Sequence, residues 1–455
     1  LAHEIQQAAR RYLVDESLTV TALTPQTQEP SGPGPDSLNF DKDAVDAVRL
    51  DNGMTVLLRQ NPTLPFVQAV FVFNAGVGQE DERNNGISNL FADVWTQGTR
   101  RFSAERLHAL LEKEAISLSA FAGRNSIGLS MSMMDKDIRL GLELLAEVVL
   151  GPVFPDEEVR KSRQRIHTSI SARDDDLPRA ARRLFLEKLF AGHPARLTEL
   201  GTHESVEALS REDVLAYYRS YVKPNSAVLA VFGNFDREAV LKHVTSLFGS
   251  MARQEVDIRS SSPAPVEARE ISEYFEKEQA VVLVGAQAVG FYHEDRYAME
   301  ILAAILGSPF RGRIFNVIRE QMGASYRLGG GFQPLRDTGY VLFHVLTSPD
   351  RAQEVKAALH GLIRELREQP VDADLLQSTK AYLIGSFRRT KETDSGFSFM
   401  TALDELYGLG WDSYKRYEER INSVTAEDVQ SLAQTYLGDQ RLLTLIGLPK
   451  SQPQP

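Results

Sequence analysis

The most informative stretch of this chain is NAGVGQEDERNNGISNLFADVWTQGT, residues 74–99. It follows FVQAVFVF at 66–73, a β-branched and aromatic run that predicts a buried strand. Beyond the acidic turn, apolar side chains recur at helical spacing at Ile87, Leu90, Phe91 and Val94. This spacing predicts a helix over 86–97 with one apolar face. A buried strand, a turn and a one-sided helix are therefore expected in succession.

On either side of this stretch, short strand-like runs alternate with helical patterns. Before it, Asn52 and Gly53 in LDNGMTVLL predict a hairpin turn that leads into a strand. Helical patterns lie at 103–114, 136–149, 155–172, 295–305 and 351–368, and strand-like runs at 227–232, 280–284, 329–333 and 340–346. Because the short connections favour antiparallel pairing, we expect an α+β fold with helices packed on one face of a mostly antiparallel sheet.

The ending of the chain is repeated twice upstream. LAQTYLGDQRLLTLIGLP at 432–449 has the layout of AARRYLVDESLTVTALTP at 8–25, and both the tyrosine and the final proline are offset by 424 residues. A looser copy, VLAYYRSYVKPNSAVLAVFG, lies at 214–233. Each copy predicts the closing helix and strand of one α/β unit. The chain would then contain three endings but only two complete bodies.

These copies predict the domain organisation. We expect two homologous domains at 45–249 and 267–450, joined by a linker at 250–266 that contains SSSPAP. Residues 1–25 would be the closing helix and strand of a preceding homologous unit, and 26–44, with QTQEPSGPGPD, a second linker. The chain would then begin inside a larger architecture. The alternative is an N-terminal extension that only resembles the repeat.

Composition excludes several classes of function. Fifty-one basic and 62 acidic residues give a net charge of -11, which disfavours a phosphate backbone, so no nucleic-acid partner is expected. No apolar run is long enough for a membrane span. The absence of cysteine excludes disulfides, thiol nucleophiles and thiolate metal sites. No two histidines stand three to five residues apart, the spacing of a helical chelating pair. The nine are His3, His108, His167, His193, His203, His243, His293, His344 and His360.

The stretch at 74–99 resembles the signature of the pitrilysin/insulinase family of inverted-motif zinc peptidases, and the resemblance extends over nearly the whole chain. Three dipeptides of the signature stand in place, Ala75-Gly76, Gly86-Ile87 and Gly98-Thr99. Active members carry H-x-x-E-H on the helix, where two histidines hold zinc and the glutamate acts as general base. Here the histidine positions hold Asn89 and Asp93, and the glutamate position holds Ala92.

Active members of the family take their third zinc ligand from a glutamate on a later helix. The matching segment here is RQRIHTSISARDDDLP at 163–178, in which the ligand position falls on Thr168 or Ser169. His167 is adjacent, but neighbouring helical positions point about 100° apart, so it cannot simply substitute. The resemblance therefore implies that this chain holds no metal or cofactor itself and that zinc belongs to a partner half.

Other polar residues near these positions receive structural interpretations. His193 in AGHPARLTELGT matches a family segment and is expected to be a capping or core histidine. The acidic turn of Glu80, Asp81 and Glu82 and the triplet DDD at 174–176 are expected to face solvent.

The second half retains a different pair of family residues. RGRIFNVIREQMGASYRLGGGF at 311–332 resembles the segment in which an arginine and a tyrosine, seven residues apart, reach from the non-catalytic half into the active site. These are Arg319 and Tyr326, suited to binding a substrate carbonyl and the oxyanion. The alternative is a surface ion pair for Arg319 and a half-buried strand position for Tyr326. The glycines at 329–331 either admit a peptide backbone or form a bulge or tight bend.

The resemblance implies a non-catalytic half of a clamshell metallopeptidase, inactive alone, with a homologous zinc-bearing subunit or upstream half as partner. Unfolded peptides would be its substrates, would add as a strand to a sheet edge, and would contact Arg319 and Tyr326. The SGPGP linker would join the halves as a hinge. The alternatives are a structural core protein or a peptide-binding module derived from the peptidase fold. A bacterial periplasm or envelope location is favoured by family habit and the lack of cysteine.

Overall fold

The computed structural model describes His3, Ile5, Gln7 and residues 44–266, 269–309, 311–325 and 327–450. The chain divides into one unit at residues 1–43 and another from residue 44 onward. Tyr326 thus lies outside the described residues, as do the segment expected at 1–25 apart from His3, Ile5 and Gln7, and the expected linker at 26–44 apart from Ala44.

The first half is built on a six-stranded sheet. Its strand order is β1 (Asp46–Arg49), β2 (Thr55–Gln60), β6 (Ala227–Gly233), β3 (Phe66–Asn74), β5 (Ser126–Met134) and β4 (Ser117–Ala122). Only the β2–β6 pair is parallel. The hairpin predicted at Asn52 and Gly53 is confirmed, because Arg49 pairs with Thr55 across the turn and Gly53 has a φ of 91°. Glycine adopts this φ without the steric cost that a Cβ would bring.

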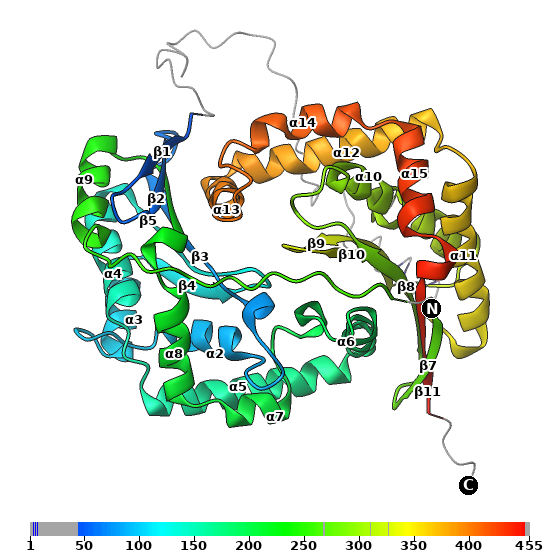
Figure 1. The fold of residues 1–455 in the computed structure, drawn as a ribbon, viewed down its shortest axis with the longest axis horizontal. Coiled ribbons are helices and arrows are strands. Elements are labelled where there is room, and N and C mark those ends of the chain that lie inside the picture. The colour runs from blue at the N-terminus through cyan, green and yellow to red at the C-terminus, as the bar shows by residue number, and fades with distance from the viewer. Residues whose placement is uncertain are drawn as a thin grey trace. The chain divides into compact units, whose positions relative to one another are not determined.

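One side of this sheet is covered by helices of the same half (Figure 1). They are α2 (Ile87–Trp95), α3 (Ala104–Lys113), α4 (Ile138–Leu150), α5 (Asp156–Asp175), α7 (His203–Ala208), α8 (Arg211–Tyr221) and α9 (Arg237–Phe248). The predicted helix at 86–97 is confirmed as α2, with Leu90, Phe91 and Val94 fully buried. The Phe91 and Trp95 rings lie 4.5 Å apart and pack into the same core as Phe71. Burial of this apolar face is what fixes α2 on the sheet.

The second half repeats the first without β1. Its sheet has the order β7 (Arg269–Phe275), β11 (Leu443–Pro449), β8 (Ala280–Ala288), β10 (Gly339–Thr347) and β9 (Arg327–Pro334), and only β7–β11 is parallel. Its helices are α10 (Arg296–Gly307), α11 (Ala352–Glu368), α12 (Ala373–Glu392), α13 (Asp394–Leu406), α14 (Tyr414–Ser423) and α15 (Ala426–Tyr436). Tyr221 ends α8 before β6, and Tyr436 ends α15 before β11. The two described copies of the repeat thus each form a helix followed by a strand, and the α+β fold class is confirmed.

Each half also covers the second face of the other half's sheet. In both halves a 20-residue helix, α5 or α12, is followed after one residue by a 13-residue helix, α6 (Leu177–Leu189) or α13. Phe185 of α6 packs in a cluster with Leu283 of β8, and Phe397 of α13 packs in a cluster with Phe232 of β6. The predicted helices on one face are thus supplemented by one exchanged helix on the other.

Within the described part of the chain, no helix combines the length and apolar character needed to span a bilayer.

Candidate functional site

The start of α2 is held by a buried carboxylate. Glu80 is 1% exposed, and its carboxylate accepts hydrogen bonds from the Gly86 backbone at 2.8 Å, the Ser88 backbone at 3.0 Å and the Asn85 amide at 2.8 Å. The Ser88 hydroxyl also donates to it. The first N–H groups of a helix lack helical acceptors, so a carboxylate there satisfies them. Burial raises the pKa of Glu80, although these hydrogen bonds act to lower it.

The expectation that the whole acidic turn faces solvent was therefore wrong for Glu80. Glu82 is exposed and pairs with Arg196, and Asp81 is half-buried with its backbone N–H donating to Asn84. At 174–176 the expectation is met by Asp174 and Asp175, which are exposed, whereas the half-buried Asp176 caps α6 and pairs with Arg327 at 3.2 Å.

The second histidine position of the motif holds an acid that is bound to the facing helix. Asp93 of α2 accepts hydrogen bonds from the Arg165 guanidinium at 2.6 and 3.2 Å and from the Ser162 hydroxyl. Both partners lie on α5, the helix that carries the third-ligand position. An ion pair thus bridges the two helices that supply the zinc ligands in active members of the family.

The first histidine position holds the half-buried Asn89. The glutamate position and the third-ligand position hold no group suited to a general base or a zinc ligand. Ala92 is 7% exposed and has no functional group to activate a water. The Thr168 and Ser169 hydroxyls donate to the carbonyls of Gln164 and Arg165 one turn earlier, at 3.1 and 3.0 Å. Such bonds satisfy a hydroxyl within its own helix.

His167 has a partner that its place in the sequence did not reveal. Its Nδ1 lies 2.8 Å from Nδ1 of His203, and its Nε2 lies 3.1 Å from Glu207 Oε2. The two imidazole rings stack with centroids 5.0 Å apart. His203 and Glu207 lie on α7, 36 and 40 residues from His167, so a search for histidines at helical spacing could not find them. His193 caps the turn at Pro194–Arg196, as expected, by accepting from the Ala195 backbone.

These donors do not fit a catalytic zinc ion. Among the described residues, no group of three or more histidine, cysteine, aspartate or glutamate side chains is arranged to hold a metal. The Asp93 carboxylate is paired with the Arg165 guanidinium. His167 and His203 face each other as hydrogen-bond partners through their Nδ1 atoms. The structure supports no chemical step through a metal in this chain.

Arg319 lies on an unusual helical segment. Residues Phe315–Gln321 form a π-helix, and the Arg319 guanidinium lies 5.0 Å from the centroid of the Phe315 ring. Its Nε is 3.8 Å from Glu320 Oε1, an ion pair of the kind that the alternative interpretation expected. π-helical turns are rare and occur often at functional sites. After the segment, the Arg327 backbone N–H donates to the Ser325 hydroxyl at 3.1 Å, which fixes the two residues that flank Tyr326.

The first sheet ends at edge strand β4 and the second at edge strand β9, and each of these strands lies against a helix. β4 lies against α2, and β9 lies against α10. The glycines at 329–331 pair in regular register with His344, Phe343 and Leu342 of β10, so they form neither a bulge nor a bend. A Cβ on Gly330 would collide with the Leu342 carbonyl, whereas a Cβ on Gly331 would meet nothing within 4 Å. The face of β9 at Gly331 is therefore open.

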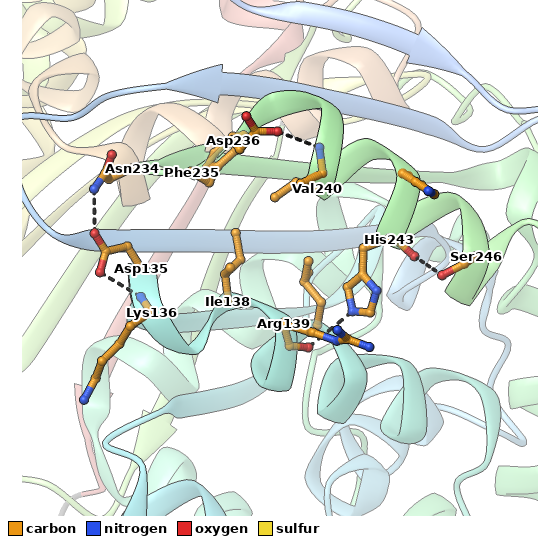
Figure 2. Close-up of a pocket in the computed structure, with 13 residues that line it drawn as sticks. Asp135, Lys136, Ile138, Arg139, Asn234, Phe235, Asp236, Val240, His243 and Ser246 are labelled. Carbon is orange, nitrogen blue, oxygen red and sulfur yellow. Dashed lines mark hydrogen bonds between the residues drawn. The ribbon is translucent and has the colours of Figure 1, made fainter.

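A hollow in another part of the first half is lined by none of these residues. It measures about 960 Å³ and lies between α4 and α9, lined by Ile138, Phe235, Val240, Lys136, Arg139 and His243 (Figure 2). A second hollow of about 390 Å³ includes Ser169 in its wall. Volume alone would select the first hollow, but only the second touches a motif position.

Comparisons with known proteins agree with the fold. The family model for insulinase (peptidase family M16) matches residues 55–203, and the model for the peptidase M16 inactive domain matches 208–383. The chain is 22% identical over 405 residues to the uncharacterized zinc protease YmxG of Bacillus subtilis, covering 88% of this chain and 98% of that protein.

Two solved structures share the fold. The peptidase M16 inactive domain from Pseudomonas fluorescens has a TM-score of 0.84 at 17% identity, covering 90% of this chain and 99% of that chain. A chain of complex III2 from Candida albicans has a TM-score of 0.77 at 19% identity, covering 89% and 96%. At these identities the likeness shows the fold alone, so the choice between peptidase and structural roles depends on the site residues.

Proposed function

Since this chain belongs to peptidase family M16, the insulinase family, we propose that it is a non-catalytic half of a zinc peptidase. It completes a peptide-binding chamber, and a homologous partner half supplies the zinc, the attacking water and the general base. The observation that carries this proposal is the ion pair between Asp93 and Arg165. It joins the two helices that bear the zinc ligands in active members of the family, and its acidic member stands at a ligand position. Hydrolysis by a zinc peptidase requires a metal-bound water and a base, and Ala92 stands where that base would be.

The proposed contribution of this chain is to bind the substrate. Arg319 would direct its guanidinium, and Tyr326 its hydroxyl, at the scissile carbonyl of a peptide held in the partner's active site. The π-helical turn at Phe315–Gln321 and the fixed residues on both sides of Tyr326 support this role. A peptide would add along a sheet edge such as β9, where backbone hydrogen bonds give affinity with little demand on sequence.

The test uses the chain purified together with its zinc-bearing partner and a quenched fluorescent peptide. Arg319→Ala or Tyr326→Phe is expected to lower kcat by about 10²-fold, the usual cost of losing one oxyanion donor. Arg311→Ala, an exposed arginine on the same segment, is the matched control and should leave turnover unchanged. Equal turnover in all variants would refute the role of the pair and favour a structural core protein. Tight peptide binding by a chain that recruits no partner would instead favour a peptide-binding module.

A further inference from the structure

The hollow beside Ser169 concentrates positive charge. It lies between the end of α5, the start of α6 and the segment 197–200. Its charged lining residues are Arg124, Arg173, Arg179, Arg182, Arg183 and Glu199. Five arginines and one glutamate thus line the hollow, in a chain whose net charge is -11. Asp174 and Glu187, which are not part of the lining, pair with Arg173 and Arg183. Such a cluster opposes folding unless something balances it.

Two of these arginines are used to build the wall. Arg124 donates to Glu199 at 2.8 Å and to the Leu197 carbonyl at 3.0 Å. Arg173 donates to Asp174 at 2.9 Å and to the Thr198 hydroxyl at 3.1 Å. Their side chains are 13% and 12% exposed, so they are fixed parts of the structure.

The other three arginines lie on one face of α6. Arg179, Arg182 and Arg183 stand at positions i, i+3 and i+4, where like charges destabilise a helix. Arg182 donates to the neutral Tyr340 hydroxyl, and Arg183 Nε is buried without a hydrogen bond, 3.6 Å from Asp174 Oδ1. Within the described residues the exposed Arg179 side chain has no hydrogen-bond or ion-pair partner. Arg183 Nη1 also lies 3.6 Å from Glu187 Oε2. Among the residues that the structure describes, this face therefore leaves the donors of the Arg179 side chain and Arg183 Nε without a hydrogen bond.

The pKa of Glu199 reflects the positive charge of the arginines around it. Burial acts to raise the pKa of Glu199, yet the charges of Arg124 and Arg182, together with hydrogen bonds, hold that pKa below its usual value. The arginines of the hollow therefore favour the ionised form of this half-exposed carboxyl group.

The hollow is also close to the motif positions. Ser169 lies one helical turn beyond Arg165, the partner of Asp93, which is a rise of about 6 Å along α5. A peptide in the chamber that reaches Arg165 would need to extend by only one or two residues to place a side chain among the arginines.

We propose that this hollow binds an acidic side chain of the peptide, so that the chamber selects peptides containing aspartate or glutamate. The inference rests on the proposed peptide-binding function. Arg179 and Arg183 would offer the forked donors that hold a carboxylate through two parallel hydrogen bonds. The volume of about 390 Å³ leaves room for the side chain and its neighbouring residues.

The test measures fluorescence anisotropy of short labelled peptides with the chain in complex with its partner half, from which zinc has been removed to prevent cleavage. One peptide carries glutamates, its twin carries glutamines in the same places, and both have amidated C-termini. The glutamate peptide is expected to bind about tenfold more tightly, with a preference that weakens as salt rises. Arg179→Gln with Arg183→Gln should abolish the preference. Arg160→Gln, an exposed arginine that pairs with Glu157 on α5, is the control and should preserve it.

Each other outcome refutes the inference in a distinct way. Equal binding of the two peptides, or a preference that survives the double substitution, would overturn the acidic specificity and leave the proposed chamber standing. If the glutamine peptide binds more tightly when its C-terminus is left free, the hollow binds a terminal carboxylate and not an acidic side chain. If neither peptide binds, the proposed peptide-binding function fails as well.

Discussion

Replacing Glu80 by alanine would remove the acceptor that organises the start of α2. The change leaves four donors without their acceptor: the backbone N–H groups of Gly86 and Ser88, the Asn85 amide and the Ser88 hydroxyl. A buried donor left unsatisfied costs about 1–3 kcal/mol. The hydroxyl can rotate and water can enter the vacated space, while removal of a buried acid recovers some desolvation energy. We therefore expect a loss of about 3 kcal/mol, well below the sum of the four.

The substitution Glu80→Gln removes the charge of this side chain and keeps nearly the same shape. If the carbonyl of the introduced glutamine accepts from Gly86 and Asn85, its NH2 group must face the Ser88 backbone N–H, which leaves one orphaned donor at a cost of about 1–3 kcal/mol. A protonated Glu80 avoids this clash, because its hydroxyl oxygen still accepts from Ser88. Since burial raises the pKa of Glu80, the wild-type advantage is fully present below pH 4.5, the ordinary value, and declines as pH rises through the raised pKa.

Urea unfolding at several pH values measures both effects, and hydrogen exchange of the Gly86 and Ser88 amides locates them. Glu82→Gln is the control, since that side chain is exposed, and it should change the unfolding free energy by less than about 0.5 kcal/mol. A loss below about 1 kcal/mol for Glu80→Ala, or protection of those amides equal to wild type, would refute the assignment of Glu80 as the anchor of α2.

Three further predictions concern packing and charge. A double-mutant cycle on Asp93 and Arg165 should give a coupling energy of at most about 1 kcal/mol, because their side chains are 39% and 51% exposed and water screens the charges. A coupling energy above about 3 kcal/mol would contradict this expectation. Phe397→Ala should lower the unfolding free energy by about 3–5 kcal/mol in calorimetry or urea, since this fully buried ring joins α13 to the first sheet. Gly330→Ala should destabilise the fold by more than about 1 kcal/mol, whereas Gly331→Ala should leave thermal stability near wild type.

Much of the fold could be predicted because local signals agreed with the tertiary structure. For three segments the local pattern was compatible with one structure only. They are the apolar run that forms β3, the one-sided helix α2 and the Asn-Gly turn. The repeated endings predicted that a helix is followed by a strand in each half, as α8 is by β6 and α15 is by β11. The hairpin of β4 and β5 was missed, although Ile127, Leu129, Met131 and Met133 alternate along β5. Serine and glycine between them weaken the usual strand signal.

The exchange of α6 and α13 could not be predicted from periodicity. An amphipathic pattern states that a helix face is buried, but not which sheet buries it. The same limit applies to the site. Glu80 was expected in solvent because carboxylates usually are, and only the tertiary fold shows the donors that surround it. The His167 contact with His203 and the arginines around Ser169 likewise join segments that are distant in sequence.

The most direct measurement of the central claim is the zinc content of the purified chain after dialysis against zinc, determined by mass spectrometry. The positive control is a variant that restores the family motif, Asn89→His, Ala92→Glu, Asp93→His and Ser169→Glu, on the same helices. Our account expects substoichiometric zinc in the wild-type chain and about one zinc per molecule in the restored variant. One tightly bound zinc in the wild-type chain, or cleavage of a peptide by that chain alone, would contradict it.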